Sequence, residues 1–129
     1  MDETRIIIAG SRSFHDYDYL AKSVNEILKI ENLTLQDNIR IISGTANGAD
    51  HLGEMFAIRN RIKLIRFPAN WDEYGKAAGV IRNRQMAEFA SEDSIKGILI
   101  VFWDGKSKGS KNMIDEAKKR NLKIYLRNI

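Results

Sequence analysis

The 129-residue sequence contains no cysteine, which excludes disulfide bonds, thiolate metal sites and a catalytic thiol. It has a single proline, Pro68, and no linker or low-complexity tract, so we expect one domain over residues 1–129. Its apolar runs fall well short of the roughly 18 residues that a membrane-spanning helix needs. The acidic start, MDETRIII, does not resemble a signal peptide. These absences predict a soluble cytoplasmic protein.

Charge is spread unevenly along the chain. Residues 1–58 hold 5 basic and 9 acidic side chains, whereas residues 59–129 hold 16 basic and 8 acidic ones. A basic half attracts phosphate-bearing molecules. Solvated helix positions such as Lys118 and Lys119 explain the same excess, so charge alone leaves both interpretations open.

Apolar and amphipathic segments alternate along the chain. The apolar runs suit β-strands at residues 5–9, 39–42, 63–67, 97–102 and 123–126. The amphipathic segments between them suit helices at residues 20–28, 49–61, 78–91 and 110–117. Such alternation predicts a Rossmann-like three-layer α/β sandwich, in which helices cover both faces of a five-stranded, mostly parallel sheet.

The composition of the strands indicates their order. Residues 6–9 and 98–102 carry no charge, as expected of strands that are buried on both faces. The strands at 63–67 and 123–126 carry lysine or arginine and suit the edges. The order 3-2-1-4-5 satisfies this pattern and places a crevice at the carboxyl ends of the first and fourth strands, where α/β proteins bind ligands.

Four loops follow the strands at this end of the predicted sheet. They read AGSRSFHDY, SGTANGAD, FPANWDEYGKAAGVIRNR and FWDGKSKGSKN. Glycine lets backbone N–H groups approach a ligand, and a following helix adds unpaired donors and partial positive charge. Turn-forming glycines and helix-capping serines are an alternative explanation of each single loop. No loop contains GxGxxG or GxxxxGK[ST], so neither standard nucleotide motif is present.

The third loop carries most of the chemistry. Trp71 and Tyr74 can stack on a base, Arg82 can bind phosphate, and Asn83 can read a base or ribose. Arg82 early in a helix opposes the helix dipole, which a purely structural helix would avoid. The two aromatic residues could instead cover the end of the sheet or a subunit interface.

The acidic and histidine residues suggest few catalytic options. Asp16 suits the N-cap of the first helix, and Asp50 suits the first turn of the second. Beside a phosphate site, Asp50 would need a ribose hydroxyl, an amino group or a metal as its partner. His15 and His51 are too far apart in the sequence to indicate a metal site, so none is expected.

Four stretches together resemble the YspA-like, cpYpsA-related branch of the SLOG superfamily. They are IIIAGSRSFHDY, IISGTANGADHLGEMFA, FPANWDEYGKAAGVIRNRQM and FWDGKSKGSKNMIDEAKKRNLKI, and they cover nearly the whole chain. The resemblance implies a Rossmann-like fold that binds a ligand at the glycine-rich rim. Its wider superfamily includes sensors of nucleotide-derived signals, Lonely-guy phosphoribohydrolases and DNA processing protein A, and many members of the branch are similar to phage or mobile-element proteins.

The phosphoribohydrolases carry a PGGxGTxxE motif where this chain has SGTANGADHLGE. This departure weakens the transfer of their catalytic glutamate to this chain. Cleavage of a glycosidic bond needs a carboxylate near the anomeric carbon, and Asp50 is the one acid at the rim that we propose for it.

Three functions remain open at this point. The first is a cytoplasmic binder that senses or sequesters a nucleotide-derived ligand, in the host cytoplasm if a phage encodes it, and that assembles as a homo-oligomer. The others are a nucleoside 5′-monophosphate N-glycosidase that uses Asp50 and a DNA-binding accessory protein. The predicted ligand-contacting residues are Gly10, Ser11, Arg12, Ser43, Gly44, Thr45, Asn47, Gly48, Asp50, Trp71, Tyr74, Lys76, Gly79, Arg82, Asn83, Ser107, Gly109 and Ser110.

Overall fold

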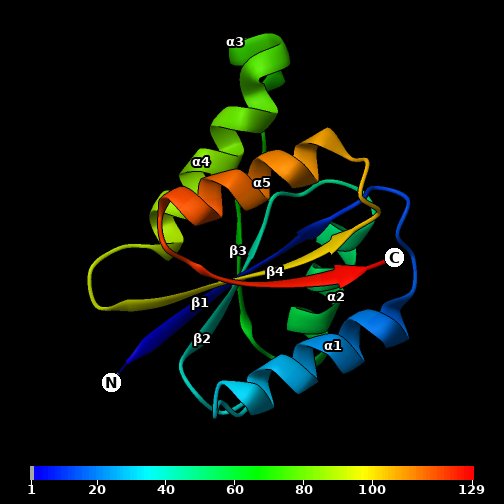
Figure 1. Ribbon diagram of the computed structural model, residues 1–129. Coiled ribbons are helices and arrows are strands. Elements are labelled where there is room, and N and C mark those ends of the chain that lie inside the picture. Colours follow the sequence, from blue (N-terminus) through cyan, green and yellow to red (C-terminus); the bar gives the residue numbers. More distant parts are fainter. Residues whose placement is uncertain (1) are drawn as a thin grey trace.

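Strand β1 (Glu3–Gly10) lies at the centre of a five-stranded parallel sheet in the computed structural model, which describes residues 2–129 (Figure 1). The other strands are β2 (Ile39–Ser43), β3 (Lys63–Arg66), β4 (Ile95–Trp103) and β5 (Lys123–Asn128). Their order is β3-β2-β1-β4-β5, which confirms the predicted topology. All four neighbouring pairs are parallel, and the longest register, β1 with β4, pairs Glu3 with Ile95 and Gly10 with Phe102.

Two helices cover each face of the sheet, as predicted (Figure 1). Helices α1 (Tyr17–Ile30) and α2 (Ala49–Arg59) pack on one face, and α4 (Ala78–Ala90) and α5 (Lys108–Lys119) pack on the other. Because successive strand residues point to opposite faces, Ile6 and Ile8 join the core under α1 and α2, whereas Ile7 and Ala9 join the core under α4 and α5. Burial on both faces explains why β1 is an uninterrupted apolar run.

The chain changes face between β1 and β4. Helix α1 follows β1 on one side of the sheet, and α5 follows β4 on the other. The connections therefore diverge at the carboxyl ends of these two neighbouring strands, which is where open α/β sheets form their ligand crevices. Asp16 caps α1 as predicted, because its Oδ1 accepts a hydrogen bond from the N–H of Tyr19 at 3.1 Å.

The third loop contains two short helices that the sequence did not indicate. They are α3 (Trp71–Tyr74) and the 3-10 helix η1 (Gly75–Ala77), and α3 protrudes beyond α4 in Figure 1. Asn70 caps α3, since its side chain accepts a hydrogen bond from the N–H of Glu73 at 3.1 Å. None of the residues of α3 and η1 is buried, so no hydrophobic periodicity exists from which to predict these helices.

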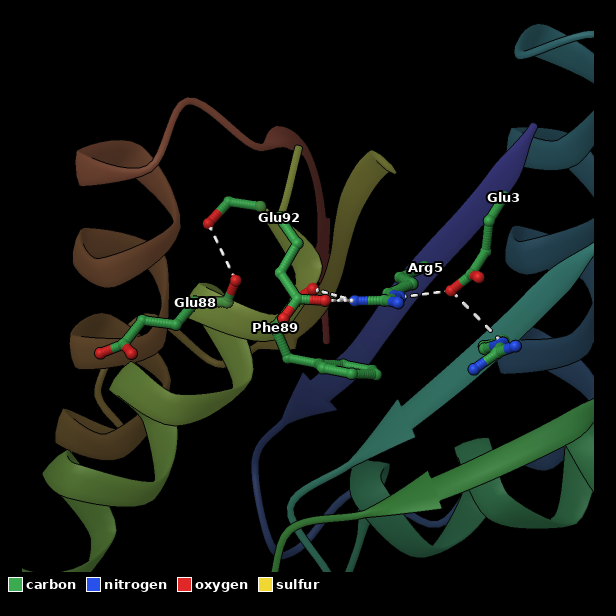
Figure 2. Close-up of polar contacts among 7 residues, drawn as sticks. Glu3, Arg5, Glu88, Phe89 and Glu92 are labelled. Atoms are coloured by element: carbon green, nitrogen blue, oxygen red, sulfur yellow. Dashed lines mark hydrogen bonds and ion pairs between the residues drawn. The ribbon is translucent and has the colours of Figure 1, made fainter. Parts of the chain in front are cut away.

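A charged cluster fastens the amino end of the sheet to the C-terminus of α4 (Figure 2). The guanidinium of Arg5 pairs with Glu3 and Glu92, donates to the carbonyl of Phe89 at 2.6 Å, and lies 3.7 Å from the centre of the Phe89 ring. Arg5 is 7% exposed, so its charge is compensated within the protein. This cluster lies at the end of β1 opposite the glycine-rich loops and stabilises the scaffold away from them.

Candidate ligand-binding cleft

The loops after β1, β2 and β4 meet helix α4 around a cavity of about 70 Å³ at the carboxyl end of the sheet. The floor is apolar and the walls are polar. The lining residues are Ala9, Gly10, Arg12, Ala46, Asp50, Arg82, Asn83, Met86, Ser107, Gly109, Ser110 and Met113. The fold thus brings all four predicted loops to one place, the third through Arg82 and Asn83 in α4, although these segments are far apart in the sequence.

Arg82 supplies a positive charge to this cavity, which we call the inner cavity. It lies in the second turn of α4, and its Nη1 donates a short hydrogen bond to the carbonyl of Gly44 at the end of β2. Its Nε donates to Oδ1 of Asn83 at 3.0 Å. Burial lowers the pKa of Arg82, and the nearby Asp50 acts in the opposite direction. A guanidinium keeps its charge despite such a shift, so Arg82 presents a fixed positive charge to the cavity.

Asp50 faces the same cavity from the first turn of α2. It is 5% exposed, and its Oδ2 accepts a hydrogen bond from the N–H of Ala46 at 3.2 Å. Burial raises the pKa of Asp50 to about 6, against the opposing effects of the Ala46 N–H and Arg82. No cation among residues 2–129 lies within ion-pairing distance of its carboxylate. The cavity therefore holds a buried acid whose charge is only partly compensated.

Asn83 is buried rather than open to a ligand, with an exposed fraction of 5%. Its amide donates to Oδ1 of Asn112 at 2.8 Å and to the carbonyl of Gly109 at 3.3 Å. Because it also accepts from Arg82, it connects that guanidinium to the first turn of α5. Asn83 lines the inner cavity, but its hydrogen bonds are to the protein itself.

Two glycines let the loops approach one another. Gly48 has φ of +76°, and a Cβ there would lie 2.3 Å from the carbonyl oxygen of Ser11. Gly44 lies against the side chains of Asp50 and Arg82, and a Cβ there would be 2.8 Å from Asp50 Oδ2. Gly44 and Gly48 are therefore required by close contacts within the protein itself, independently of any ligand.

The predicted serines fall into two groups. Ser11 and Ser43 are buried and engaged: Ser11 Oγ accepts from the N–H of Asp104 at 3.3 Å, and Ser43 Oγ donates to Glu54 at 2.6 Å. Ser107 and Ser110 line the inner cavity at the N-terminus of α5, where Ser107 caps the helix by accepting from the Ser110 N–H. The first pair holds the loops together. The second pair lines the cavity, although Ser110 is 4% exposed and its Oγ donates to Ser107 Oγ at 3.2 Å.

An outer groove of about 260 Å³ adjoins the inner cavity. The two share Arg12, Ala46 and Arg82 in their linings, and the groove adds Gly44, Thr45, Pro68, Ala69 and Trp71. Trp71 is 53% exposed, and its ring lies beside Gly79, 3.6 Å from where a Cβ on that glycine would be. Thr45 has φ of +65°, a strained conformation for a β-branched residue of the kind found at functional sites.

Seven of the predicted residues line neither of the two cavities, namely Ser11, Ser43, Asn47, Gly48, Tyr74, Lys76 and Gly79. Of these, Asn47, Tyr74 and Lys76 are exposed. Conversely, Met86 and Met113 form part of the cavity floor, and Asn112 orients Asn83, but sequence reasoning missed all three in these roles. Their helical spacing indicates only that Met86 and Met113 face the sheet, so the sequence holds no signal for a cavity above them.

Residues 2–129 contain neither a metal-binding cluster nor a membrane-spanning helix. In that part of the chain no three histidine or acidic residues gather in a way that could hold a metal ion. None of the helices described there is long and apolar enough to cross a membrane.

Comparison with known proteins confirms the resemblance to the cpYpsA-related SLOG family that the loop sequences indicated. The family described as the YspA, cpYpsA-related SLOG family matches residues 4–74, more than half of the chain. The Gene 61 protein of Mycobacterium phage D29 is 26% identical over 125 residues, covering 93% of both chains. The X-ray structure of DNA processing protein A from Streptococcus pneumoniae has a TM-score of 0.66 and 21% identity, over 98% of this chain. This chain spans 50% of that structure's length, and the likeness establishes the Rossmann-like fold alone.

Proposed function

Because the chain belongs to the YspA, cpYpsA-related SLOG family, we propose that its cleft binds a nucleotide or a nucleotide-derived signal, which the protein senses or sequesters. Family membership supports a nucleotide-related or DNA-processing role in general. The observation that carries the narrower proposal is the position of Arg12 and Arg82. They come from different segments, yet both line the inner cavity and the outer groove, so two cations stand where the two compartments join.

The inner cavity suits a phosphate group. Arg82 supplies a fixed guanidinium, and Arg12 a second one from the β1 loop. The first turn of α5 adds the positive end of a helix dipole, which favours anions. These are the donors that commonly bind phosphate oxygens, and charge-assisted hydrogen bonds of this kind are stronger than neutral ones.

The outer groove suits a nucleoside. Trp71 offers an exposed ring beside Pro68 and Ala69, and no acidic side chain lines this groove. Stacking of a base on an aromatic ring contributes about 1 to 3 kcal/mol and tolerates different bases. A ligand that spans both compartments would therefore place its phosphate beside Arg82 and its base near Trp71.

Calorimetric titration with nucleoside mono- and diphosphates, ADP-ribose and cyclic ADP-ribose variants tests this proposal. We expect at least one nucleotide to bind and to be recovered unchanged. Arg82→Gln should weaken binding about 10- to 100-fold, the effect of losing a charged hydrogen bond of about 1.5 to 3 kcal/mol. Arg84→Gln removes the same charge from an exposed position of α4 and should bind normally. The absence of binding across the panel, or equal losses in the two variants, rejects the proposal.

A nucleoside 5′-monophosphate N-glycosidase is the second candidate, and the position of Asp50 favours it. This carboxylate is buried in the same cavity as Arg82, and its raised pKa suits proton transfer near neutral pH. Glycosidic cleavage requires such a group beside the anomeric carbon. Chromatography would detect free base released by the wild type and not by Asp50→Asn. If no nucleotide releases base, this candidate is excluded and the binding proposal is unaffected.

A DNA-binding accessory role has less support from the geometry. The two arginines line a cavity of about 70 Å³, which suits one terminal phosphate better than a continuous backbone. Electrophoretic shifts with single-stranded DNA at several salt concentrations test this role, because backbone binding weakens steeply with salt. A shift that persists at physiological salt and is lost in Arg82→Gln would favour DNA over a free nucleotide.

A further inference from the structure

The inner cavity holds one more polar feature that nucleotide binding alone does not explain. Oδ2 of Asp50 accepts from the Ala46 N–H, but no donor within residues 2–129 reaches Oδ1. Because Asp50 is 95% buried and lines the inner cavity, this oxygen is aimed at the space that a ligand would enter. Oδ1 is not among the fully enclosed side-chain atoms that lack a partner, so it is accessible from the cavity and can accept a hydrogen bond from a ligand, or donate one once it is protonated.

The volume of the cavity limits what can enter it. Its 70 Å³ is about half of the roughly 150 Å³ that accommodates benzene in an engineered protein cavity, so a nucleobase does not fit. A single tetrahedral oxyanion does. Such a group would lie among Arg12, Arg82 and the α5 N-terminus, next to Asp50.

The charges of the neighbouring groups decide the protonation state of Asp50. Arg82 faces it from α4 and Arg12 from the β1 loop, both cationic, while Glu54 faces it from the next turn of α2 and repels a second negative charge. The α5 residues at the cavity are the uncharged Ser107 and Ser110. With an ionised Asp50, a dianion would leave the cavity with a net charge of −1, whereas with a protonated Asp50 the two arginines neutralise it.

We propose that the inner cavity binds the terminal phosphoryl group of the ligand and that Asp50 takes up one proton from solvent as it binds, donating it in a hydrogen bond to a phosphoryl oxygen. This inference rests on the proposed nucleotide-binding function and specifies the ligand as a phosphomonoester. No bond breaks: the carboxylate becomes a carboxylic acid, and the oxyanion keeps its charge. Because burial raises the pKa of Asp50 to about 6, its carboxyl group is only partly protonated at neutral pH before the ligand binds.

Inorganic sulfate is a suitable probe because it stays fully ionised between pH 6 and 8.5. Any pH dependence of its binding therefore reports protonation of the protein and not of the ligand. At constant ionic strength, the affinity of the wild type for sulfate should fall by about 20-fold between pH 6.5 and 8, as expected for one group with a pKa near 6. Asp50→Asn should bind with less than about a twofold change over that range, since its amide donates without titrating. Two buffers of different ionisation enthalpy should show uptake of nearly one proton per sulfate by the wild type at pH 7.5.

His51→Gln and His15→Gln are the matched controls, since they replace the two histidines of the sequence and His51 is the neighbour of Asp50. Both variants should retain the wild-type pH dependence. A flat profile in the wild type, a slope that persists in Asp50→Asn, or the slope lost in His51→Gln overturns the proton link. If AMP binds but sulfate does not, the cavity does not hold a lone oxyanion. The inference is then rejected, and the proposed nucleotide-binding function is not. If another member of the nucleotide panel binds but AMP, phosphate and sulfate do not bind at pH 6, the inference fails and the proposed function stands, whereas absence of binding across the whole panel rejects both.

Discussion

Asn83 fixes the direction of Arg82, its neighbour in α4, by accepting a hydrogen bond from its Nε at 3.0 Å. The amide of Asn83 is fixed in turn by Oδ1 of Asn112 at 2.8 Å. Helix α5 therefore orients a cation that belongs to α4. The position of the charge in the cleft depends on how the two helices pack.

Replacing Asn83 should weaken both the fold and the cleft. In Asn83→Ala the carbonyl of Gly109 and the Asn112 side chain lose a donor in a buried setting, which costs about 1 to 3 kcal/mol in unfolding free energy. Sulfate affinity should also fall, because Arg82 loses its support. Chemical denaturation and sulfate titration measure the two effects. Gln85→Ala alters an exposed residue of the same helix and should change neither.

Asp50 should lower the unfolding free energy of the protein at high pH. Its folded-state pKa, about 6, lies above the ordinary value of 3.8, so stability is fully present below pH 3.8 and is lost as pH rises through 6. Asp50→Asn should therefore raise the unfolding free energy at pH 8, by at most about 3 kcal/mol, and change it little at pH 4. Denaturant titrations at the two pH values measure this difference. Equal effects at both would show that the burial of the charge is not the cause.

Glu31 should stabilise the protein in the opposite pH range. Its side chain is 2% exposed and pairs with Lys96 at 2.7 Å and Lys123 at 2.9 Å, with a further hydrogen bond from Tyr125. Burial alone would raise the pKa of Glu31, but these partners outweigh it and lower the pKa to about 2. The stability it contributes is present above pH 4.5 and lost as pH falls toward 2.

The variant Glu31→Gln should accordingly lose about 3 kcal/mol of unfolding free energy at pH 7, and this deficit should shrink as pH falls toward 2. Glu26→Gln is the matched control, since Glu26 is an exposed acid on the same helix. Its denaturation profile should follow the wild type at every pH. A deficit of Glu31→Gln that does not depend on pH would mean that lost packing, and not the ionised contacts, explains it.

Gly48→Ala should lower the unfolding free energy by more than the strain of a positive φ angle alone would cause. Gly48 and Gly75 both have positive φ, +76° and +56°, but an added Cβ meets Ser11 at 2.3 Å in the first case and nothing within 4 Å in the second. Gly75→Ala should cost about 1 kcal/mol through backbone strain, whereas Gly48→Ala should cost about 3 kcal/mol or more. Thermal unfolding compares the two variants. Equal costs would show that the close approach of the two loops does not constrain this position.

Trp71→Ala should distinguish the role of the outer groove from that of the inner cavity, because it removes a side chain that lines the groove alone. Because Trp71 is half exposed, its loss should leave the unfolding free energy within about 0.5 kcal/mol of the wild type. Nucleotide affinity should fall roughly tenfold, the effect of one lost stacking contact, while sulfate affinity should not change. Tyr74→Ala removes an exposed ring from the same short helix that lines neither cavity, and it should bind both ligands normally.

Much of the fold could be predicted because its signals are local. Uncharged runs at Ile6 to Ala9 and Ile98 to Phe102 mark strands that are buried on both faces, and these strands are central in the structure. Helix α3 escaped prediction because it has no buried face. At the cleft, the sequence indicated Arg82, because an arginine early in a helix opposes the helix dipole, and Asp50, because it is the one acid proposed at the rim.

The sequence by itself determined the alternation of strands and helices, the order of the sheet and the loops that gather at its carboxyl end. These features follow from hydrophobic periodicity and from the charge of each strand, which are local properties of the sequence. Only the tertiary structure decided that Arg82 is held by Gly44 and Asn83, that Asp50 is buried with a raised pKa, and that Gly48 makes room for Ser11. These properties depend on contacts between segments far apart in the chain. Burial and electrostatic environment arise from such packing, and no local pattern encodes them.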